Sequence, residues 1–543
     1  MTDSKDPMVP DGEVTPIDTD YQIGQDNIIV NVGPFGLDIH NRVFAISGLT
    51  VIAFVALTLM FQNHVEPLFS GLRGWLTSNL DWFFLSAGNI FVLVCLGLAV
   101  SPLGRVRLGG TEAKPDYSYL GWFSMLFAAG MGIGLMFYGV SEPLSHFGSA
   151  LGGTSVDNGV RTDWAPLGAA AGDSEAATRL GMAATIYHWA LHPWAIYAVL
   201  ALGLALFSFN KGLPLTVRSV FYPLLGERVW GWPGHIIDIL AVFATLFGLA
   251  TSLGLGASQA SSGLHHLFGV PLGTTTQIML VIAITAIALV SVVAGLNAGV
   301  KRLSEINMVL AVVLLLFVVV VGPTLAIVTG FFANLGAYLQ HLPALSNPLG
   351  REDANFTQGW TAFYWAWWIS WSPFVGMFIA RVSRGRTVRE FIVSVLIVPS
   401  LACVLWMTVF GETAISQVVK DGYKAATEAE LPLQLFAMLD ALPLAHITSF
   451  VAIVLVVVFF VTSSDSGSLV IDVIAAGGKV DAPTAQRVFW CVFEGLVAIA
   501  LILGGGLVAL QAMAVSTGLP FTVVLLMSTV AVIKGLASEP RPR

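Results

Sequence analysis

The chain has 543 residues, of which 56% are hydrophobic and only 11% are charged. Soluble domains average about 25% charged residues, so this composition excludes a soluble globular protein and indicates an all-α polytopic membrane protein. The net charge of −8 comes largely from the N-terminal segment and from predicted outer loops, and it does not indicate a nucleic-acid partner.

Residues 1–42 carry eight acidic and two basic residues and lack the pattern of a signal peptide. Such a composition predicts an acidic, disordered cytoplasmic tail. Beyond it, apolar runs of about 20 residues predict twelve transmembrane helices in the lipid bilayer. The predicted ranges are 43–62, 82–101, 118–140, 180–208, 235–263, 274–295, 305–331, 360–381, 389–411, 445–469, 487–508 and 510–533.

The distribution of basic residues predicts the orientation of these spans. With the N-terminus inside, nineteen Lys and Arg residues fall on the inner side and six fall on the outer side. Because inner loops of membrane proteins are enriched in basic residues, both termini are expected in the cytoplasm.

The third predicted span contains three glycines spaced two residues apart. Glycines at this spacing make unwinding of the helix easier and let a ligand approach the backbone. Unwound backbone inside a membrane is tolerated only where it lines a cavity. We therefore expect Gly130, Met131, Gly132 and Gly134 to contribute to a substrate site.

Two spans place aromatic residues away from the membrane surface, where membrane tryptophans are usually found. They are Trp189, Trp194 and Tyr197 in the fourth span and Trp367, Trp368 and Trp371 in the eighth. Several aromatic faces at this depth could bind a cation that has no N–H group, such as a quaternary ammonium. The alternative is a layer of aromatic packing. Pro373, directly after the cluster, predicts an interruption of the eighth span and favours a site.

The two interrupted spans, the third and the eighth, are five spans apart. This placement predicts two five-helix repeats of inverted topology with a site between them. The predicted division is 43–116 for two additional helices, 117–335 for the first repeat, 336–359 for an amphipathic periplasmic connector, 360–534 for the second repeat and 535–543 for a short cytoplasmic tail.

The tenth span ends in a run of hydroxyl residues, TSSDSGS at 462–468. Uncharged oxygens suit an alkali ion that must also be released, but hydroxyls on a helix often bond to their own backbone. Both interpretations stay open from the residues alone. No paired nucleophile and base and no metal-ligating cluster stands out, so neither an enzyme nor a cofactor is expected.

At these positions the chain resembles the betaine/choline/carnitine transporter family. The matching stretches are GMGIGLMFYGVSEPL at 130–144, HWALHPWAIY at 188–197, WAWWISWSPFVGMFIARVSRGRTVREF at 365–391 and the hydroxyl run of the tenth span. The resemblance implies secondary transport of a quaternary-ammonium or similar small solute across a bacterial-type inner (plasma) membrane. It also implies the leucine-transporter type of five-plus-five inverted repeat and a homotrimer.

Carried over residue by residue, the resemblance implies three sets of site residues. The aromatic box corresponds to Trp189, Trp194, Tyr197 and Trp368, with Trp367 and Trp371 alongside, and the flexible backbone corresponds to Gly130–Gly134. A coupling sodium ion corresponds to Ala128, Met131, Phe459, Thr462 and Ser463. A second ion would use Thr245 and Phe374, but Leu249 stands where another threonine is expected, which puts that ion in doubt.

The function implied is sodium-coupled symport, by alternating access, of glycine betaine or a related quaternary-ammonium or sulfonium zwitterion. Choline-moving relatives tend to carry Asp at the position of Gly134, so this glycine favours a zwitterion. The alternatives are a proton-coupled choline or carnitine carrier or exchanger and, from another class, a transport-inactive solute receptor.

Overall fold

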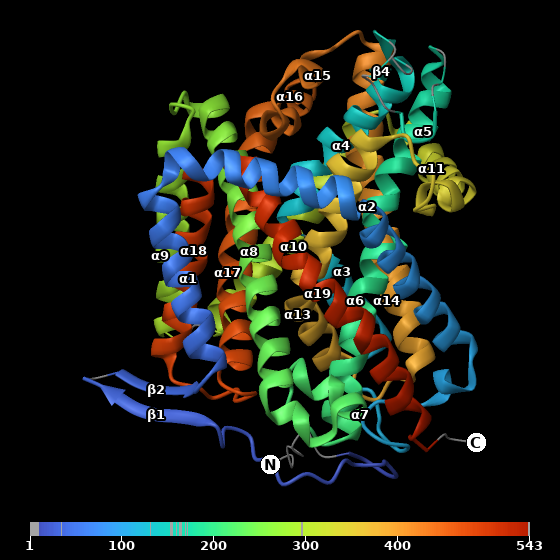
Figure 1. The fold of residues 1–543 in the computed structure, drawn as a ribbon. Coiled ribbons are helices and arrows are strands. Elements are labelled where there is room, and N and C mark those ends of the chain that lie inside the picture. The colour runs from blue at the N-terminus through green and yellow to red at the C-terminus, as the bar shows by residue number, and fades with distance from the viewer. Residues whose placement is uncertain are drawn as a thin grey trace.

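A computed structural model describes residues 10–540 except for 34, 131, 153–155, 159, 162–164, 169, 171 and 295–296. The described chain is almost entirely helical (Figure 1). Its helices are α1 (Val43–Met60), α2 (Gln62–Val100), α3 (Tyr119–Gly130), α4 (Ile133–Gly152), α5 (Ser174–Trp189), α6 (Leu191–Ala205), α7 (Tyr222–Leu225), α8 (Trp232–Phe268), α9 (Thr274–Ala294), α10 (Asn297–Val321), α11 (Thr324–Ser346), α12 (Ala354–Phe356), α13 (Ala362–Val382), α14 (Val388–Lys420), α15 (Ala425–Glu428), α16 (Gln434–Asp440), α17 (Ala445–Ala475), α18 (Thr484–Leu503) and α19 (Gly506–Ala537). The strands β1 (Asn27–Val32) and β2 (Phe35–His40) form one hairpin, and β3 (Val156–Asp157) and β4 (Val160–Arg161) form another.

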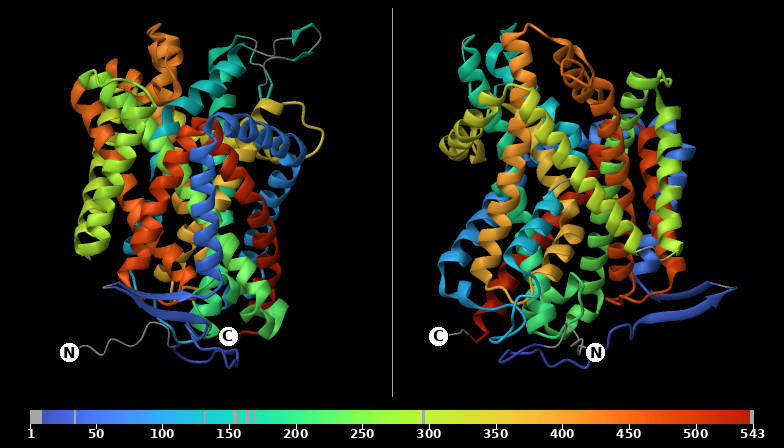
Figure 2. Two further views of the ribbon diagram at one scale, coloured as in Figure 1. Left: turned by 60° about the vertical axis from the view of Figure 1, so that its left-hand side comes forward. Right: turned by 180° about the vertical axis from the view of Figure 1, so that it is seen from behind.

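The bundle has the composition of a polytopic membrane protein. Among the described residues, eleven helices are long and apolar enough to cross a membrane, and the bent pair α3 and α4 makes a twelfth. The described chain begins and ends at the same end of this bundle (Figures 1 and 2). Each of the twelve predicted spans corresponds to a helix or a helix pair, which confirms the fold class. The two sets of twelve differ in one member, because the predicted eighth span corresponds to α13, which is not among the eleven helices, whereas α11 is among them. The inverted relation between 117–335 and 360–534 stays a prediction.

Helix α13 is rich in aromatic residues and carries Trp365, Trp367, Trp368 and Trp371. It packs against α6, α8 and α19 in the middle of the bundle, so most of its side chains contact protein and not lipid. The predicted interruption at Pro373 is wrong, since α13 runs unbroken through it. Proline removes the N–H that would bond the carbonyl of Ile369, and the Ser372 hydroxyl donates to that carbonyl at 2.7 Å instead.

The boundary after the seventh span also differs from the prediction. Helix α10 ends at Val321 and α11 begins at Thr324, so the predicted end of the span at 331 and the start of the connector at 336 both fall inside α11. The sequence Gly322-Pro323 explains the break, because proline cannot continue a helix and favours an extended residue before it. Figure 1 shows α11 at one side of the upper end of the bundle, beside α5.

Part of the N-terminal segment, where disorder was predicted, has regular structure. Asn27–Val32 and Phe35–His40 form the hairpin β1–β2, in which Ile28 pairs with Ile39 and Val30 pairs with Leu37. Its inner residue Asp38 forms an ion pair with Lys479. Apolar residues alternate along Phe35–His40 and make up most of Asn27–Val32, which indicates two strands. The prediction of disorder relied on the acidic composition of the whole segment and overlooked this pattern.

A buried ion pair beside this hairpin joins the segment before α7 to the start of α8. Arg218 and Asp238 are both at most 1% exposed and bond through the guanidinium Nε and through the Arg218 backbone N–H. The guanidinium also lies 3.4 Å from His40 Nε2. Burial and the nearby guanidinium lower the pKa of His40 to about 3, so that this imidazole is neutral at physiological pH and Asp238 remains the counterion of Arg218.

We expect Arg218→Ala to lower the stability of the folded protein by about 3–5 kcal/mol, because it leaves the Asp238 carboxylate buried without a counterion. Arg228→Ala is the matched control, since Arg228 is exposed nearby and substitutions at such positions usually change stability by less than about 0.5 kcal/mol. Thermal unfolding in detergent compares the two. Equal unfolding temperatures for both variants would show that the pair adds no stability.

Candidate functional site

The third predicted span is broken, as expected. Helices α3 and α4 meet at an angle of 66°, and Gly132 lies between them. Gly130 is the last residue of α3, whereas Met131 lies outside the described residues. The break brings the start of α4 to the edge of an internal cavity.

This cavity has a volume of about 250 Å³ and lies between the broken span, α5, α6, α8, α10, α13, α14 and α17. All six predicted aromatic residues line it: Trp189, Trp194, Tyr197, Trp367, Trp368 and Trp371. Gly132 and Gly134 line it as well. Among the described lining residues there is no charged side chain. The rings therefore border an open volume, which a simple packing layer would fill.

The rings meet at steep angles around this volume. The ring planes of Trp189 and Trp368 are inclined at 81° with centroids 5.0 Å apart, and those of Tyr197 and Trp368 at 89° with centroids 6.0 Å apart. Trp367 stacks beside Trp368 at 5.2 Å. Rings that differ in orientation can present π-faces to one cation from several sides.

Hydrogen bonds to surrounding groups fix the indole rings. Trp368 Nε1 donates to the backbone carbonyl of His188 at 3.0 Å. Trp367 and Trp371 both donate to Ser252 Oγ, at 3.1 and 3.0 Å. Ser252 was not among the predicted site residues. It is one of several hydroxyl residues on α8, and its partners lie more than 110 positions further along the chain.

Gly134 lies directly against two rings of the aromatic site. A Cβ atom there would lie 2.8 Å from the Trp367 ring and 2.9 Å from the Trp189 ring. A Cβ at Gly132 would meet nothing within 4 Å. The two glycines therefore differ in role: Gly134 makes room for the rings, whereas Gly132 lies at the break.

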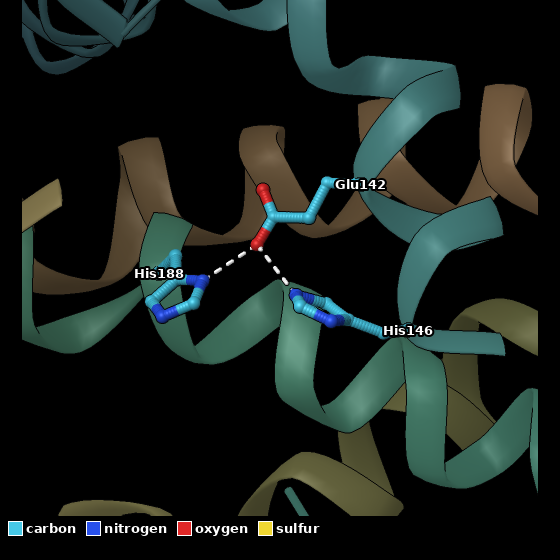
Figure 3. Close-up of side chains that lie close together, drawn as sticks. All are labelled: Glu142, His146 and His188. Atoms are coloured by element: carbon cyan, nitrogen blue, oxygen red, sulfur yellow. Dashed lines mark hydrogen bonds and ion pairs between the residues drawn. The ribbon is translucent and has the colours of Figure 1, made fainter. Parts of the chain in front are cut away.

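Glu142, His146 and His188 form a buried cluster (Figure 3), and Trp189 of the box donates a hydrogen bond to its carboxylate. One carboxylate oxygen of Glu142 lies 2.5 Å from His188 Nδ1 and 3.3 Å from His146 Nε2. The other oxygen accepts from Trp189 Nε1 at 2.7 Å and from the Tyr364 hydroxyl at 2.6 Å. Such a trio could bind a metal ion in principle, but every carboxylate oxygen here already has two hydrogen-bond partners.

Sequence reasoning missed this cluster and found no metal-ligating group. Glu142 and His146 stand four residues apart and so share a face of α4, which is a detectable signal. His188 comes from α5, and only the folded chain brings it to them.

The residues expected around the first sodium ion lie on the same cavity. Ala128, Phe459, Thr462 and Ser463 line it. The Thr462 hydroxyl donates a hydrogen bond to the Val458 carbonyl at 2.9 Å. Because its proton points to that carbonyl, the lone pairs of the hydroxyl oxygen can coordinate a cation. Sodium binding here stays a prediction.

The doubtful second ion site is not assembled in the same way. Phe374 lines the cavity, but Thr245 is not among the lining residues. The Thr245 hydroxyl donates to the Ala241 carbonyl at 2.8 Å. Leu249 is buried against the backbone at Gly467, so it places methyl groups where the missing oxygen was expected.

Comparison with known proteins gives a consistent result. The profile of the betaine/carnitine/choline family of transporters matches residues 42–541. A glycine betaine/proline/choline transporter of Vibrio parahaemolyticus is 75% identical over 532 residues, which are 98% of this chain and 96% of that protein. Glycine betaine transporter 1 of the same organism is 55% identical and covers 96% of this chain and 97% of its own length. The glycine betaine transporter OpuD of Bacillus subtilis is 40% identical over 500 residues, 90% of this chain and 94% of its own length. A match of this extent shows that the chain belongs to the betaine/carnitine/choline transporter family.

Proposed function

We propose that this protein is a sodium-coupled symporter of glycine betaine or a closely related zwitterion. The observation that carries the proposal is that six aromatic side chains and the hydroxyl residues of α17 line the same cavity. The family implies an inner-membrane homotrimer with both termini in the cytoplasm, and we include these features in the proposal.

The aromatic lining suits the ammonium end of the substrate. A trimethylammonium group offers no N–H, so a site can recognise it through π-faces and shape. No charged side chain stands among the described lining residues, so the substrate's carboxylate needs another partner. Helix α4 begins at Ile133 on the cavity wall, and the free N–H groups and positive dipole of a helix N-terminus favour an anionic group.

The direction of the cavity supports alternating access. From Trp367 it continues along α13 to Phe378 and along α17 to Ser466, and both helices run toward the end of the bundle where the termini lie (Figure 1). On the other side, Tyr364 and Trp360 stack at 6.3 Å over the box. We interpret this as a conformation whose site is closed to the outside and continues inward.

The closest rival substrate is choline, a cation without a carboxylate. The similar Vibrio protein is named for glycine betaine, proline and choline, whereas Gly134 favours a zwitterion. Uptake of labelled betaine, choline, carnitine, proline and dimethylsulfoniopropionate into proteoliposomes, with and without a sodium gradient, tests the proposal. Betaine uptake that needs inward sodium supports it, and uptake driven equally by a proton gradient without sodium would contradict it.

We expect Trp368→Leu to weaken betaine binding about tenfold or more. Leucine keeps apolar bulk but removes a π-face, and each cation–π contact contributes roughly 0.5–2 kcal/mol when desolvated, where 1.4 kcal/mol corresponds to a factor of ten. Trp368→Phe keeps an aromatic face and should weaken binding less. Calorimetric titration measures both variants, and equal affinities for Leu and Phe would count against cation–π recognition.

A further inference from the structure

Glu142 is fully buried within the membrane-spanning bundle beside the box (Figure 3). Four side chains surround its two oxygens: two histidines, one indole and one phenol. The indole N–H of Trp189 can only donate. A carboxylate accepts four such bonds without conflict, whereas a protonated carboxyl group would have to turn a donor toward one of these partners. The arrangement therefore fits an ionised Glu142.

The two histidines do not need to be charged to make these bonds. His188 Nδ1 faces Glu142 and its Nε2 lies 2.9 Å from Thr361 Oγ1, which a neutral ring satisfies by donating from Nδ1 and accepting at Nε2. His146 uses only Nε2 toward Glu142. The ring centroids of the two histidines are 6.0 Å apart, so two imidazolium ions here would repel each other. With both histidines neutral, the cluster carries one net negative charge.

This charge lies directly behind two aromatic residues of the site region. Trp189 lines the cavity and donates its N–H to Glu142. Tyr364 donates its hydroxyl to the same oxygen and stacks on Trp368, with centroids 6.2 Å apart and planes inclined at 20°. A carboxylate that accepts a hydrogen bond from an indole N–H or a phenol O–H fixes the orientation of that aromatic ring. It also increases the electron density on the π-face of the ring.

We infer that Glu142 is a specificity-determining residue, a buried anion that positions the box and favours substrates with a net positive charge. The inference rests on the proposed function, because it assigns a role toward the same substrate site. None of the described residues that line the cavity is charged. Glu142 bonds to the lining residue Trp189, so its charge contributes a negative potential to the cavity. A zwitterion gains less from it than a cation, because its carboxylate is repelled while its ammonium is attracted.

The test is Glu142→Gln, which keeps the shape and removes the charge. Dissociation constants of choline and glycine betaine are measured in detergent by calorimetry, at one sodium concentration. We expect the choline constant to rise about tenfold relative to the betaine constant. The reason is that the side chain of the Glu142→Gln variant no longer attracts the ammonium group, and the attraction between charges is stronger inside a protein than in water.

Two further variants separate charge from structure. Tyr364→Phe removes one hydrogen bond to Glu142 but keeps the charge, so it should leave the ratio of the two constants within about twofold. Glu412→Gln removes the charge of another buried carboxylate, which pairs with Arg179 at 2.8 Å and does not line the cavity. It should also leave the ratio unchanged.

A Glu142→Gln variant that binds both ligands with the wild-type ratio overturns the inference. A wild-type protein that binds betaine but not choline at any attainable concentration overturns it too, because the anion must favour a cation. A wild-type protein that binds neither ligand contradicts the proposed function itself. If Glu142→Gln does not fold, Glu142→Asp is measured instead, and a ratio equal to the wild type is then the supporting result, because the charge is kept.

Discussion

Gly134→Ala is expected to weaken glycine betaine binding by at least about tenfold. The added methyl group would stand 2.8 Å from the Trp367 ring and 2.9 Å from the Trp189 ring, closer than real side-chain contacts allow. Both rings are hydrogen-bonded, Trp367 to Ser252 and Trp189 to Glu142, so neither can move freely. Overpacking of this kind typically costs about 1–3 kcal/mol, and 1.4 kcal/mol corresponds to a factor of ten.

Gly132→Ala is the matched control, because it adds the same methyl group to the same cavity wall. No atom lies within 4 Å of that methyl group, and its affinity for betaine should stay within about twofold of the wild type. Titration followed by tryptophan fluorescence measures binding and reports any change in the rings. Similar losses in both variants would show that flexibility of the broken span, and not room for the rings, is what these glycines provide.

This geometry also changes how an acidic residue at Gly134 would act. The resemblance to choline-moving relatives suggests that Gly134→Asp would favour choline over betaine. In this chain an aspartate would first have to displace Trp189 or Trp367. We therefore expect loss of binding of both solutes unless the rings are given room elsewhere.

The twelve spans and the break between Gly130 and Ile133 could be predicted because their causes are local. Apolar length determines a span, and closely spaced glycines weaken one helix. The unbroken course of α13 could not be predicted from Pro373 alone, since the Ser372 hydroxyl replaces the lost bond. The Gly322-Pro323 pair is a sequence signal for the break between α10 and α11. It was overlooked because the residues on both sides are apolar and were predicted as one continuous span.

The aromatic lining of the cavity could be predicted, but its supports could not. Spacing along one helix shows which rings share a face, so the clusters in the fourth and eighth spans indicated a common site. Ser252 and Glu142 hold Trp367, Trp371 and Trp189 through contacts that span between 47 and 119 positions in the chain. A pairing between distant elements leaves no periodic pattern in one sequence.

Combined replacement of Thr462→Ala and Ser463→Ala is expected to abolish sodium-dependent uptake or to raise the sodium concentration needed at least tenfold. Both residues line the cavity, and a dehydrated cation that loses an oxygen ligand is destabilised by several kcal/mol unless water or a carbonyl replaces it. Ser466→Ala is the control, since Ser466 lines the same cavity but is not among the expected ligands. Betaine uptake into proteoliposomes at varied sodium concentration measures all three proteins. An unchanged sodium dependence in the double variant would place the ion elsewhere.

The number of sodium ions sets the accumulation that the transporter can sustain. Betaine carries no net charge, so each sodium ion that enters through ~100 mV contributes about 2.3 kcal/mol, and a tenfold sodium gradient adds about 1.4 kcal/mol. One ion then sustains an accumulation ratio of roughly 500, and two ions sustain roughly the square of that value. Because Thr245 lies away from the cavity lining and Leu249 presents methyl groups, we expect a ratio of one sodium ion per betaine. Simultaneous sodium and betaine fluxes at a clamped voltage measure this ratio. A ratio of two would mean that neighbouring oxygens, of which Ser252 lines the cavity and Thr251 bonds to the Leu510 carbonyl, replace the ligand that Leu249 cannot supply.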